Sequence, residues 1–224
     1  MMSPMRHLLV IVALPVLGLL ACGSEPPPTP PVTTPSLFPL AVGHRWTYRV
    51  TESDGTTNTK VQSVTKTATT SVGDGFQLKT ARNNDEIYSV QVMSADGKLL
   101  RLNEESYENG TLKERLVFNP SSLRVDTALT SVGSTYESTH EERSLSLIND
   151  TVLSAISKTQ RFFVEASDEA VTVPAGTYRA VRVRRETVGS VQKTFWYVFG
   201  VGKVKETGGQ TEELEKVELV ETVP

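Results

Sequence analysis

Hydrophobic and polar residues alternate over many short stretches of this chain, which is the pattern of β-strands that bury one face. Trp46, Tyr48 and Val50 share one face of such a stretch, and Val217 and Leu219 share a face near the end of the chain. A period of two places successive side chains on opposite faces of a sheet. The pattern predicts strands at approximately 44–52, 58–70, 75–82, 86–94, 98–104, 111–118, 134–147, 160–166, 169–173, 178–188, 191–199, 202–207 and 211–221.

Tight turns separate several of these predicted strands. An Asp-Gly or Asn-Gly pair favours a two-residue hairpin loop, because these residues tolerate positive φ. Such pairs occur at Asp54-Gly55, Asp74-Gly75, Asp96-Gly97 and Asn109-Gly110. Residues 149–159 fit either a short helix or a loop that crosses an open end. We therefore expect an all-β fold, an antiparallel meander whose strongly curved sheet forms a barrel, a half-barrel or an open sandwich.

Composition narrows the functional classes. The chain has 224 residues, a net charge of −3 and 38% hydrophobic residues, so it can build a core but lacks the basic excess of a nucleic-acid-binding protein. Its single cysteine excludes an intramolecular disulfide. Its histidines are His7, His44 and His140, which leaves little for a metal site or a histidine-based catalytic centre. We expect no metal, no cofactor and no nucleic-acid partner.

The first 22 residues carry a targeting signal. Arg6 precedes an apolar run from Leu8 to Leu20, which is shorter than the roughly 20 residues of a membrane-spanning helix and is typical of a signal peptide over residues 1–21. Leu19-Leu20-Ala21-Cys22 resembles the lipobox of bacterial lipoproteins. The resemblance implies cleavage before Cys22, a diacylglycerol on its thiol, and a membrane as partner. The alternative is an ordinary secretory peptide followed by a chance cysteine.

A proline-rich segment follows the cysteine. Six prolines fall between Pro26 and Pro35, which predicts that residues 22–36 form the lipidated cysteine and an extended tether. A proline-rich recognition motif is the alternative. Residues 37–224 then form a single β domain. Gly23 follows the cysteine in place of the Asp that retains many lipoproteins at the inner membrane, so the lipoprotein resemblance implies a periplasmic protein anchored in the outer membrane.

The most apolar strand runs from Thr194 to Phe199 and admits two interpretations. Phe195, Tyr197 and Phe199 share one face, and Trp196 shares the other with Val198. The first interpretation is a central strand covered on both faces, with Trp196 buried. The second is that Phe195, Tyr197 and Phe199 form the wall of a cavity for a lipid or another apolar ligand.

Arginines cluster in the preceding strand. Arg182 and Arg184 share one face at a spacing of about 7 Å and are a candidate site for an anionic headgroup or glycan. The alternative is a solvated outer face that pairs with the Glu-rich strand 212–221. Neighbouring carboxylates in this chain point to opposite faces, and no serine lies in a Gly-x-Ser-x-Gly motif, so we predict no catalytic residues.

Three segments carry a family resemblance. FPLAVGHRWTY (38–48), VTVPAGTYRAVRVRR (171–185) and FWYVFGVGKVKE (195–206) resemble a poorly characterised, TapB-like family of secreted β-rich bacterial proteins. The resemblance implies a secreted β domain and names no activity. We expect a non-enzymatic binding or structural module of the envelope. The alternative is a carrier or sensor that holds a lipid or lipopeptide on the concave face of the sheet. A hydrolase is a third possibility, which would require convergent carboxylates or a serine with a base, and His44 and His140 are the histidines left to serve as that base.

Overall fold

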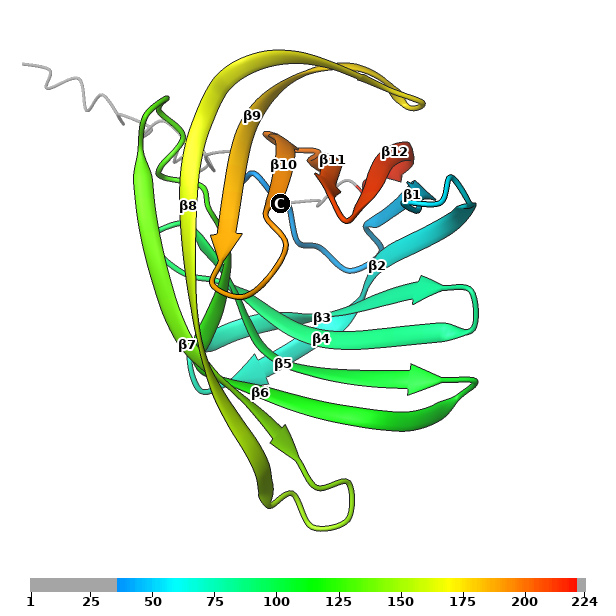
Figure 1. The fold of residues 1–224 in the computed structure, drawn as a ribbon, viewed down its shortest axis with the longest axis vertical. Helices are drawn as coiled ribbons and strands as arrows, with labels where there is room; N and C mark the ends of the chain where they lie inside the picture. The colour runs from blue at the N-terminus through cyan, green and yellow to red at the C-terminus, as the bar shows by residue number, and fades with distance from the viewer. Residues whose placement is uncertain (1–35, 221–224) are drawn as a thin grey trace, which may run out of the picture. The chain divides into compact units, whose positions relative to one another are not determined.

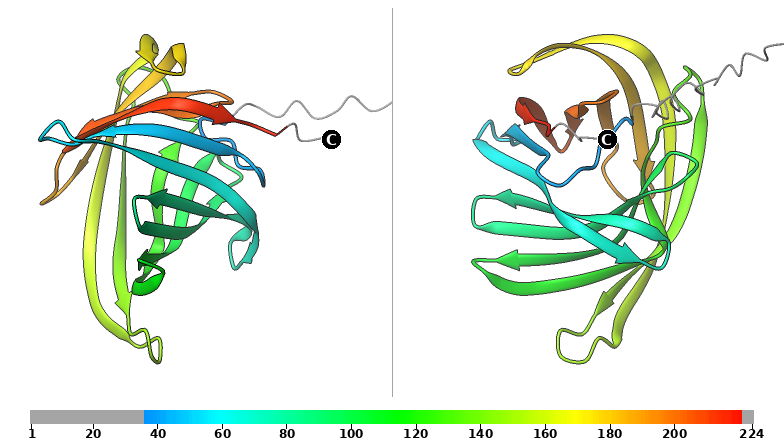
Figure 2. Two further views of the ribbon diagram at one scale, coloured as in Figure 1. Left: turned by 90° about the vertical axis from the view of Figure 1, so that its right-hand side faces the viewer. Right: turned by 180° about the vertical axis from the view of Figure 1, so that it is seen from behind.

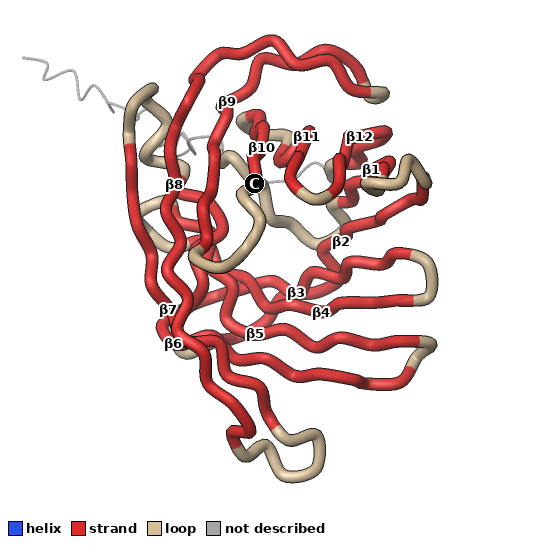
Figure 3. The backbone as a smooth tube through the Cα atoms, viewed as in Figure 1, coloured by secondary structure: helices blue, strands red, loops and turns tan. Residues whose placement is uncertain are grey.

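The computed structural model describes residues 36–220, which form a closed antiparallel barrel of twelve strands (Figure 1). Strands and loops make up this part of the chain (Figure 3). The strands are β1 (Arg45–Thr51), β2 (Thr57–Thr70), β3 (Gly73–Arg82), β4 (Asp85–Met93), β5 (Lys98–Glu108), β6 (Thr111–Asp126), β7 (Thr135–Leu145), β8 (Val152–Val173), β9 (Gly176–Thr187), β10 (Lys193–Val198), β11 (Gly202–Gly208) and β12 (Gln210–Glu218).

Each strand pairs with its neighbours in the sequence, and the pairing of β1 with β12 closes the barrel. The all-β antiparallel meander expected from the alternating pattern is therefore confirmed, and the barrel is the form that it takes. Closure satisfies the backbone groups that an open sheet would leave at its two edges. Figure 2 shows the short strands β10, β11 and β12 beside β1, with the long β8 and β9 curving around them.

The predicted turns are confirmed at 54–55, 96–97 and 109–110, where Gly55, Gly97 and Gly110 have positive φ. The turn predicted at Asp74-Gly75 is wrong, because both residues lie inside β3. A Cβ on Gly75 would come within 2.9 Å of the Val92 side chain and 3.0 Å of the Gln91 carbonyl oxygen. This glycine therefore permits a close approach of two strands and does not form a turn.

The prediction for residues 149–159 is also wrong. Most of this segment belongs to β8, which pairs with β7 from Val152 to Phe163 and continues without a break to Val173. The separate strands predicted at 160–166 and 169–173 are one strand, because irregularities around Ala166 shift the register without ending the pairing. Such bulges break the alternation in the sequence while the backbone ladder continues.

The core lies inside the barrel and at the end where the chain enters it. Trp46, Tyr48 and Val50 are buried as the alternation predicts. Phe38 stacks on Trp46 with ring centroids 4.8 Å apart, and the Trp46 indole N–H donates to the Val201 carbonyl at 2.6 Å. A twelve-stranded barrel is wider than the eight-stranded barrels that side chains readily fill, so long side chains must cross its interior. Across residues 36–220, no helical segment has the length and hydrophobicity needed to cross a membrane.

Candidate functional site

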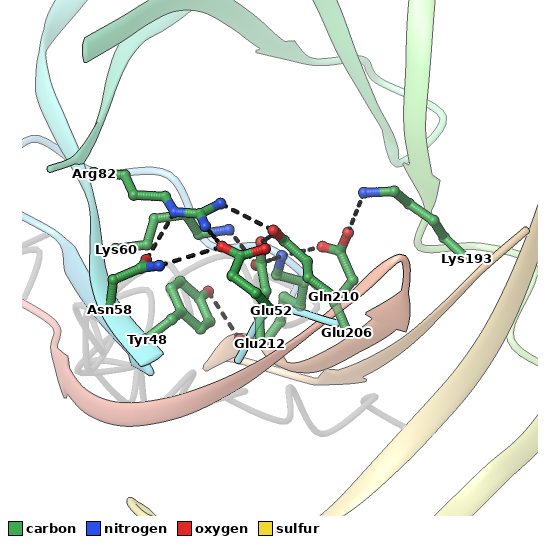
Figure 4. A network of polar contacts seen from close by, with 10 residues as sticks. Tyr48, Glu52, Asn58, Lys60, Arg82, Lys193, Glu206, Gln210 and Glu212 are labelled. Carbon is green, nitrogen blue, oxygen red and sulfur yellow. Dashed lines mark hydrogen bonds and ion pairs between the residues drawn. The ribbon is translucent and has the colours of Figure 1, made fainter. Parts of the chain in front are cut away.

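Charged side chains occupy the barrel interior between β2, β11 and β12 (Figure 4). The ammonium group of Lys203 contacts the carboxylates of Glu206 and Glu212, the latter at 2.6 Å. Glu212 also accepts a hydrogen bond from Lys60, and Glu206 accepts one from Lys193 at 2.6 Å. Lys203, Glu206 and Glu212 are each at least nine-tenths buried. We call Lys60, Lys193, Lys203, Glu206 and Glu212 the lysine–glutamate cluster.

Strand register brings this cluster together. Glu206 and Glu212 are directly paired residues of β11 and β12, and Lys60 is opposite Tyr48 across β1 and β2. The Tyr48 hydroxyl donates to the Lys203 carbonyl at 2.9 Å, and the ammonium groups of Lys60 and Lys203 lie 5.0 and 5.1 Å from the centre of its ring. A buried aromatic ring thus supports both cations from one side.

A second set of polar contacts continues the network toward Glu52, near the end of β1 (Figure 4). Arg82 pairs with Glu52, donates to the Asn58 side chain at 2.7 Å and donates to Gln210 at 2.9 Å. Gln210 in turn donates to Glu212 at 2.7 Å. The lysine–glutamate cluster is therefore continuous with hydrogen-bonded groups that reach less buried positions.

Burial and neighbouring charges shift the ionisation of these groups in opposite directions. Burial is the largest single influence and would raise the pKa of Glu206 and of Glu212, but Lys203 and the other neighbouring lysines together outweigh it, so the pKa of each lies below its ordinary value. Burial is likewise outweighed at Lys203, whose pKa is raised by Glu206 and Glu212. Lys60 differs, because burial and the charge of Lys203 lower its pKa to about 8. At neutral pH the cluster holds paired, opposite charges.

This pairing sets what the cluster can do chemically. Each carboxylate is held by ammonium groups, so the site differs from a pair of carboxyls that share a proton for acid–base chemistry. Within residues 36–220 there is no group of three or more His, Cys, Asp or Glu side chains arranged to hold a metal ion. The arrangement is that of a polar plug, which fills the wide barrel and fixes the strands around it.

The predicted aromatic wall is only partly assembled. Phe195 and Tyr197 point inward and stack with ring centroids 5.9 Å apart, but Phe199 lies beyond the end of β10 and is 43% exposed. The prediction that the three side chains share one wall is therefore wrong, because the strand ends before Phe199. Phe195 and Tyr197 line an interior cavity of about 50 Å³ together with Arg124, Lys203 and Glu206.

Trp196 lies on the outer face of the same strand. Its ring is only partly buried, its N–H donates to Glu169 at 3.2 Å, and the Lys205 ammonium group lies 6.0 Å from the ring centre. The expectation of a strand covered on both faces is therefore wrong for Trp196. The inward face is buried in the core, and charged side chains of neighbouring strands flank the outward face.

Arg182 and Arg184 also face outward, and both are paired. Arg182 contacts Glu169 at 2.8 Å and Arg184 contacts Glu165 at 2.6 Å, with further pairing to Glu186. The alternative that predicted pairing with strand 212–221 named the wrong partner, because β9 is hydrogen-bonded to β8 and β10. Existing carboxylates thus occupy the two guanidinium groups, which leaves little capacity for an external anion.

The other candidate residues are separate from one another. The ring nitrogens of His44 lie 3.2 Å from the carbonyl oxygens of Pro39 and Val220, whereas His140 packs edge-on against Phe118. Within residues 36–220, no hydrogen bond joins either imidazole to a serine or a carboxylate. Cys22 lies outside the described residues, so its lipidation stays a prediction.

Sequence reasoning missed the lysine–glutamate cluster. The sequence does contain a signal for it. Glu212 shares a strand face with the buried Leu214, two positions away, and Lys60 shares one with Gln62, which places both charges on inward faces. Pairing them required the register of strands that are far apart in the sequence, as Lys60 and Glu212 are 152 positions apart.

Comparisons with known proteins find two similar solved structures and no family. No protein-family model matches the chain, and no curated protein matches it. Two solved structures are similar: a "putative exported protein with YmcC-like fold" from Bacteroides fragilis, with a TM-score of 0.45, and a "putative lipoprotein" from Parabacteroides distasonis, with a TM-score of 0.43. Each is 14% identical over 83% of this chain and 100% of its own. At this level of similarity the two structures carry no argument about this chain.

Proposed function

We propose that this protein is a non-enzymatic β-barrel module of the cell envelope, anchored to the outer membrane through lipid at Cys22 and held away from the surface by residues 22–36. The proposal rests on the Leu-Leu-Ala-Cys sequence at 19–22 and on a barrel in which the interior lysines and glutamates of the lysine–glutamate cluster are paired with one another. Two or three acyl chains anchor a protein stably, whereas one chain does not. The module acts by binding or by structural support in the envelope.

One observation separates this proposal from a lipid carrier. Phe195 and Tyr197, the two residues of the expected wall that do face inward, line a cavity of about 50 Å³. Pockets that enclose a drug-sized ligand usually measure about 300–1,000 Å³, so this cavity is too small for an acyl chain. The interior position of these aromatic rings supports a role in the core.

Replacing the cysteine tests the anchor. We expect Cys22→Ser to abolish incorporation of labelled fatty acid and to release the protein from the membrane fraction, because a hydroxyl does not replace the thiol as the acceptor of the lipid. Ser24→Ala is the matched control and should stay in the membrane. Sedimentation of native envelopes on a density gradient should place the wild-type protein with outer-membrane markers. Continued acylation of Cys22→Ser, or a wild-type protein in the inner-membrane fraction, would contradict the corresponding part of the proposal.

The unanchored Cys22→Ser protein also tests the carrier alternative. Native mass spectrometry of this variant should show no bound lipid, because the cavity lined by Phe195 and Tyr197 is too small for an acyl chain. One lipid molecule bound per molecule of the variant would favour the carrier and would overturn the proposed module.

A further inference from the structure

Three arginines gather in the barrel interior, and two of them lack a carboxylate partner, in contrast to the lysine–glutamate cluster. They are Arg101 on β5, Arg124 on β6 and Arg185 on β9. Arg101 pairs with Glu104, whereas Arg124 and Arg185 have no carboxylate at ion-pair distance anywhere in residues 36–220. An interior charge without a counter-ion is costly, so a protein that retains two such arginines beside a third needs something to balance them.

The three side chains surround one region of the interior. Arg124 lines the cavity of about 50 Å³, together with Gln91 and Phe195. The Arg185 guanidinium lies 4.9 Å from the centre of the Phe195 ring. Arg101 is the cross-strand partner of Gln91. Arg124 thus lines a space that holds about three or four water molecules or one small ion, and Arg185 and Arg101 lie next to residues of its wall.

Unpartnered polar atoms gather beside these arginines. The side chain of Ser122 is the cross-strand partner of Arg101 and is fully buried, yet its hydroxyl has no hydrogen-bond partner within residues 36–220. The same is true of Arg101 Nε and of Nδ1 of His140, whereas two further atoms of this kind, Gln160 Oε1 on β8 and Arg182 Nε on the outer face, do not belong to this group. The Phe118 ring links two of them, since the Arg101 guanidinium lies 4.3 Å from its centre and His140 packs on its edge.

Buried polar atoms in folded proteins are normally satisfied by the protein, by water or by a bound ion. Each unsatisfied group costs about 1–3 kcal/mol, so a cluster of them beside unbalanced cations indicates an occupant. Electrostatics indicate the sign of its charge. Burial, reinforced by the charge of Arg124, lowers the pKa of Arg101 and of Arg185 to about 10. An anion would relieve both the burial and the mutual repulsion.

One carboxylate, that of Glu206, also lines the cavity and could balance the arginines. Glu206 faces the same space, but Lys203 and Lys193 hold its charge from the other side. Its carboxylate is therefore balanced by the lysine–glutamate cluster and leaves the arginines short of negative charge. Nearby Gln62 and Gln91 add amide groups that can donate hydrogen bonds to an oxyanion.

We propose that the barrel interior binds one small oxyanion, of the size of phosphate, sulfate or a short carboxylate, between Arg124, Arg185 and Arg101. Planar guanidinium groups suit such anions because they donate two parallel hydrogen bonds. This site goes beyond the proposed envelope function, since anion binding does not depend on the lipid at Cys22.

Binding is tested on the full-length, lipidated protein in a non-ionic detergent. Isothermal titration calorimetry with inorganic phosphate, at constant ionic strength, should show one site per chain with a Kd of about 1 mM or tighter. Sulfate and acetate are titrated in parallel arms, and their ranking separates a tetrahedral inorganic anion from a carboxylate. The absence of saturable binding of all three anions to the folded protein would overturn the proposal.

Arginine variants locate the site. Arg124→Gln and Arg185→Gln should each weaken binding by about tenfold or more, because each removes a charged donor. The matched control is Arg182→Gln, whose guanidinium faces outward and is paired with Glu165 and Glu169, and its affinity should equal that of wild type. Equal affinity in all four proteins would place the anion elsewhere and would overturn the assignment.

A second readout remains informative if one variant folds poorly. Without added anion, Arg124→Gln should melt at a higher temperature than wild type, because the substitution removes an uncompensated buried charge. Saturating phosphate should raise the melting temperature of wild type by several degrees and that of Arg124→Gln by much less, so that the difference shrinks or reverses. An equal rise in both proteins would reveal a non-specific salt effect and would contradict the site. Arg185→Gln serves the same comparison if Arg124→Gln does not fold.

Discussion

Glu212 shows how single side chains hold the interior together. Two lysines from different strands converge on its carboxylate, Lys60 from β2 and Lys203 from β11, and Gln210 donates a third hydrogen bond. Water cannot replace these partners, because Glu212 is only 3% exposed. Loss of the carboxylate therefore leaves two buried cations with one fewer negative charge between them.

We expect Glu212→Gln to lower the free energy of unfolding by about 3–5 kcal/mol, because it leaves uncompensated buried charge. The matched control is Glu218→Gln, which removes an exposed partner of Lys216 and should cost less than about 1 kcal/mol. Urea unfolding measures both. Adding Lys60→Met to Glu212→Gln should recover part of the loss, and a single-variant cost below about 1 kcal/mol would contradict the charge argument.

The two tryptophans make a second residue-scale comparison. Trp46 is fully buried, stacks on Phe38 and donates to Val201, whereas Trp196 lies half-buried on the outer face. We expect Trp46→Ala to cost about 3–5 kcal/mol in urea unfolding, because it opens a cavity in the core. Trp196→Ala should cost clearly less, since its site is open to solvent on one side. Equal costs would show that the outer face of β10 is as tightly packed as the core.

At the level of elements, glycines determine how closely neighbouring strands approach. Gly208 ends β11 with φ +120°, and a Cβ there would lie 2.2 Å from the Gln192 carbonyl oxygen and 3.0 Å from the Lys193 Cα. Its neighbour Gly209 also has positive φ, but a Cβ there would meet nothing within 4 Å. Substitution of Gly208 therefore tests a collision with neighbouring backbone, whereas substitution of Gly209 tests only the strain of positive φ.

Gly208→Ala should destabilise the barrel by more than Gly209→Ala does, because the backbone of Gln192 and Lys193 would have to move. We expect about 1 kcal/mol for Gly209→Ala, from strain alone, and a distinctly larger loss for Gly208→Ala. Thermal unfolding of both variants checks the order. Equal losses would mean that the loop before β10 yields freely.

The same elements show how far the sequence predicts the structure. Asp-Gly and Asn-Gly turns with flanking alternation located three hairpins, since turn and strand signals there are local. The Asp74-Gly75 pair led to a wrong prediction of a turn. A glycine that makes room for a neighbouring strand cannot be told from a turn glycine in the sequence. Residues 149–159 show no alternation of hydrophobic and polar residues, so the sequence gives no sign of a strand there. Most of them belong to β8 because they pair with β7.

Prediction of the interior sites is limited for a different reason. Alternation places Glu212 and Arg185 on inward faces, but the partners of each depend on bulges such as those at Thr47/Tyr48 and Trp196/Tyr197. One bulge reverses the facing of every residue after it. A buried ion pair and a buried uncompensated arginine therefore look alike in the sequence.

At the scale of the whole molecule, the width of the barrel explains its polar interior. Twelve strands enclose more space than short aliphatic side chains fill, and long lysine, arginine and glutamate side chains reach across it. Their ionic contacts depend on direction, so they also restrict which strands can lie opposite one another. The core of this barrel combines an apolar end around Trp46 with a charged middle.

The seam between β1 and β12 has one more consequence, for circular permutation. Residue 220 lies beside the start of β1, since the His44 ring contacts the Val220 carbonyl at 3.2 Å. A Gly/Ser linker that runs from residue 220 to residue 36 should therefore allow new termini at the exposed turn between Asn109 and Gly110. We expect this permutant to fold with a circular dichroism spectrum like that of the parent. Opening the chain between Arg161 and Phe162, inside β8, should prevent folding, because the cut interrupts a strand paired on both sides. If both permutants fold equally well, the unbroken length of β8 is dispensable.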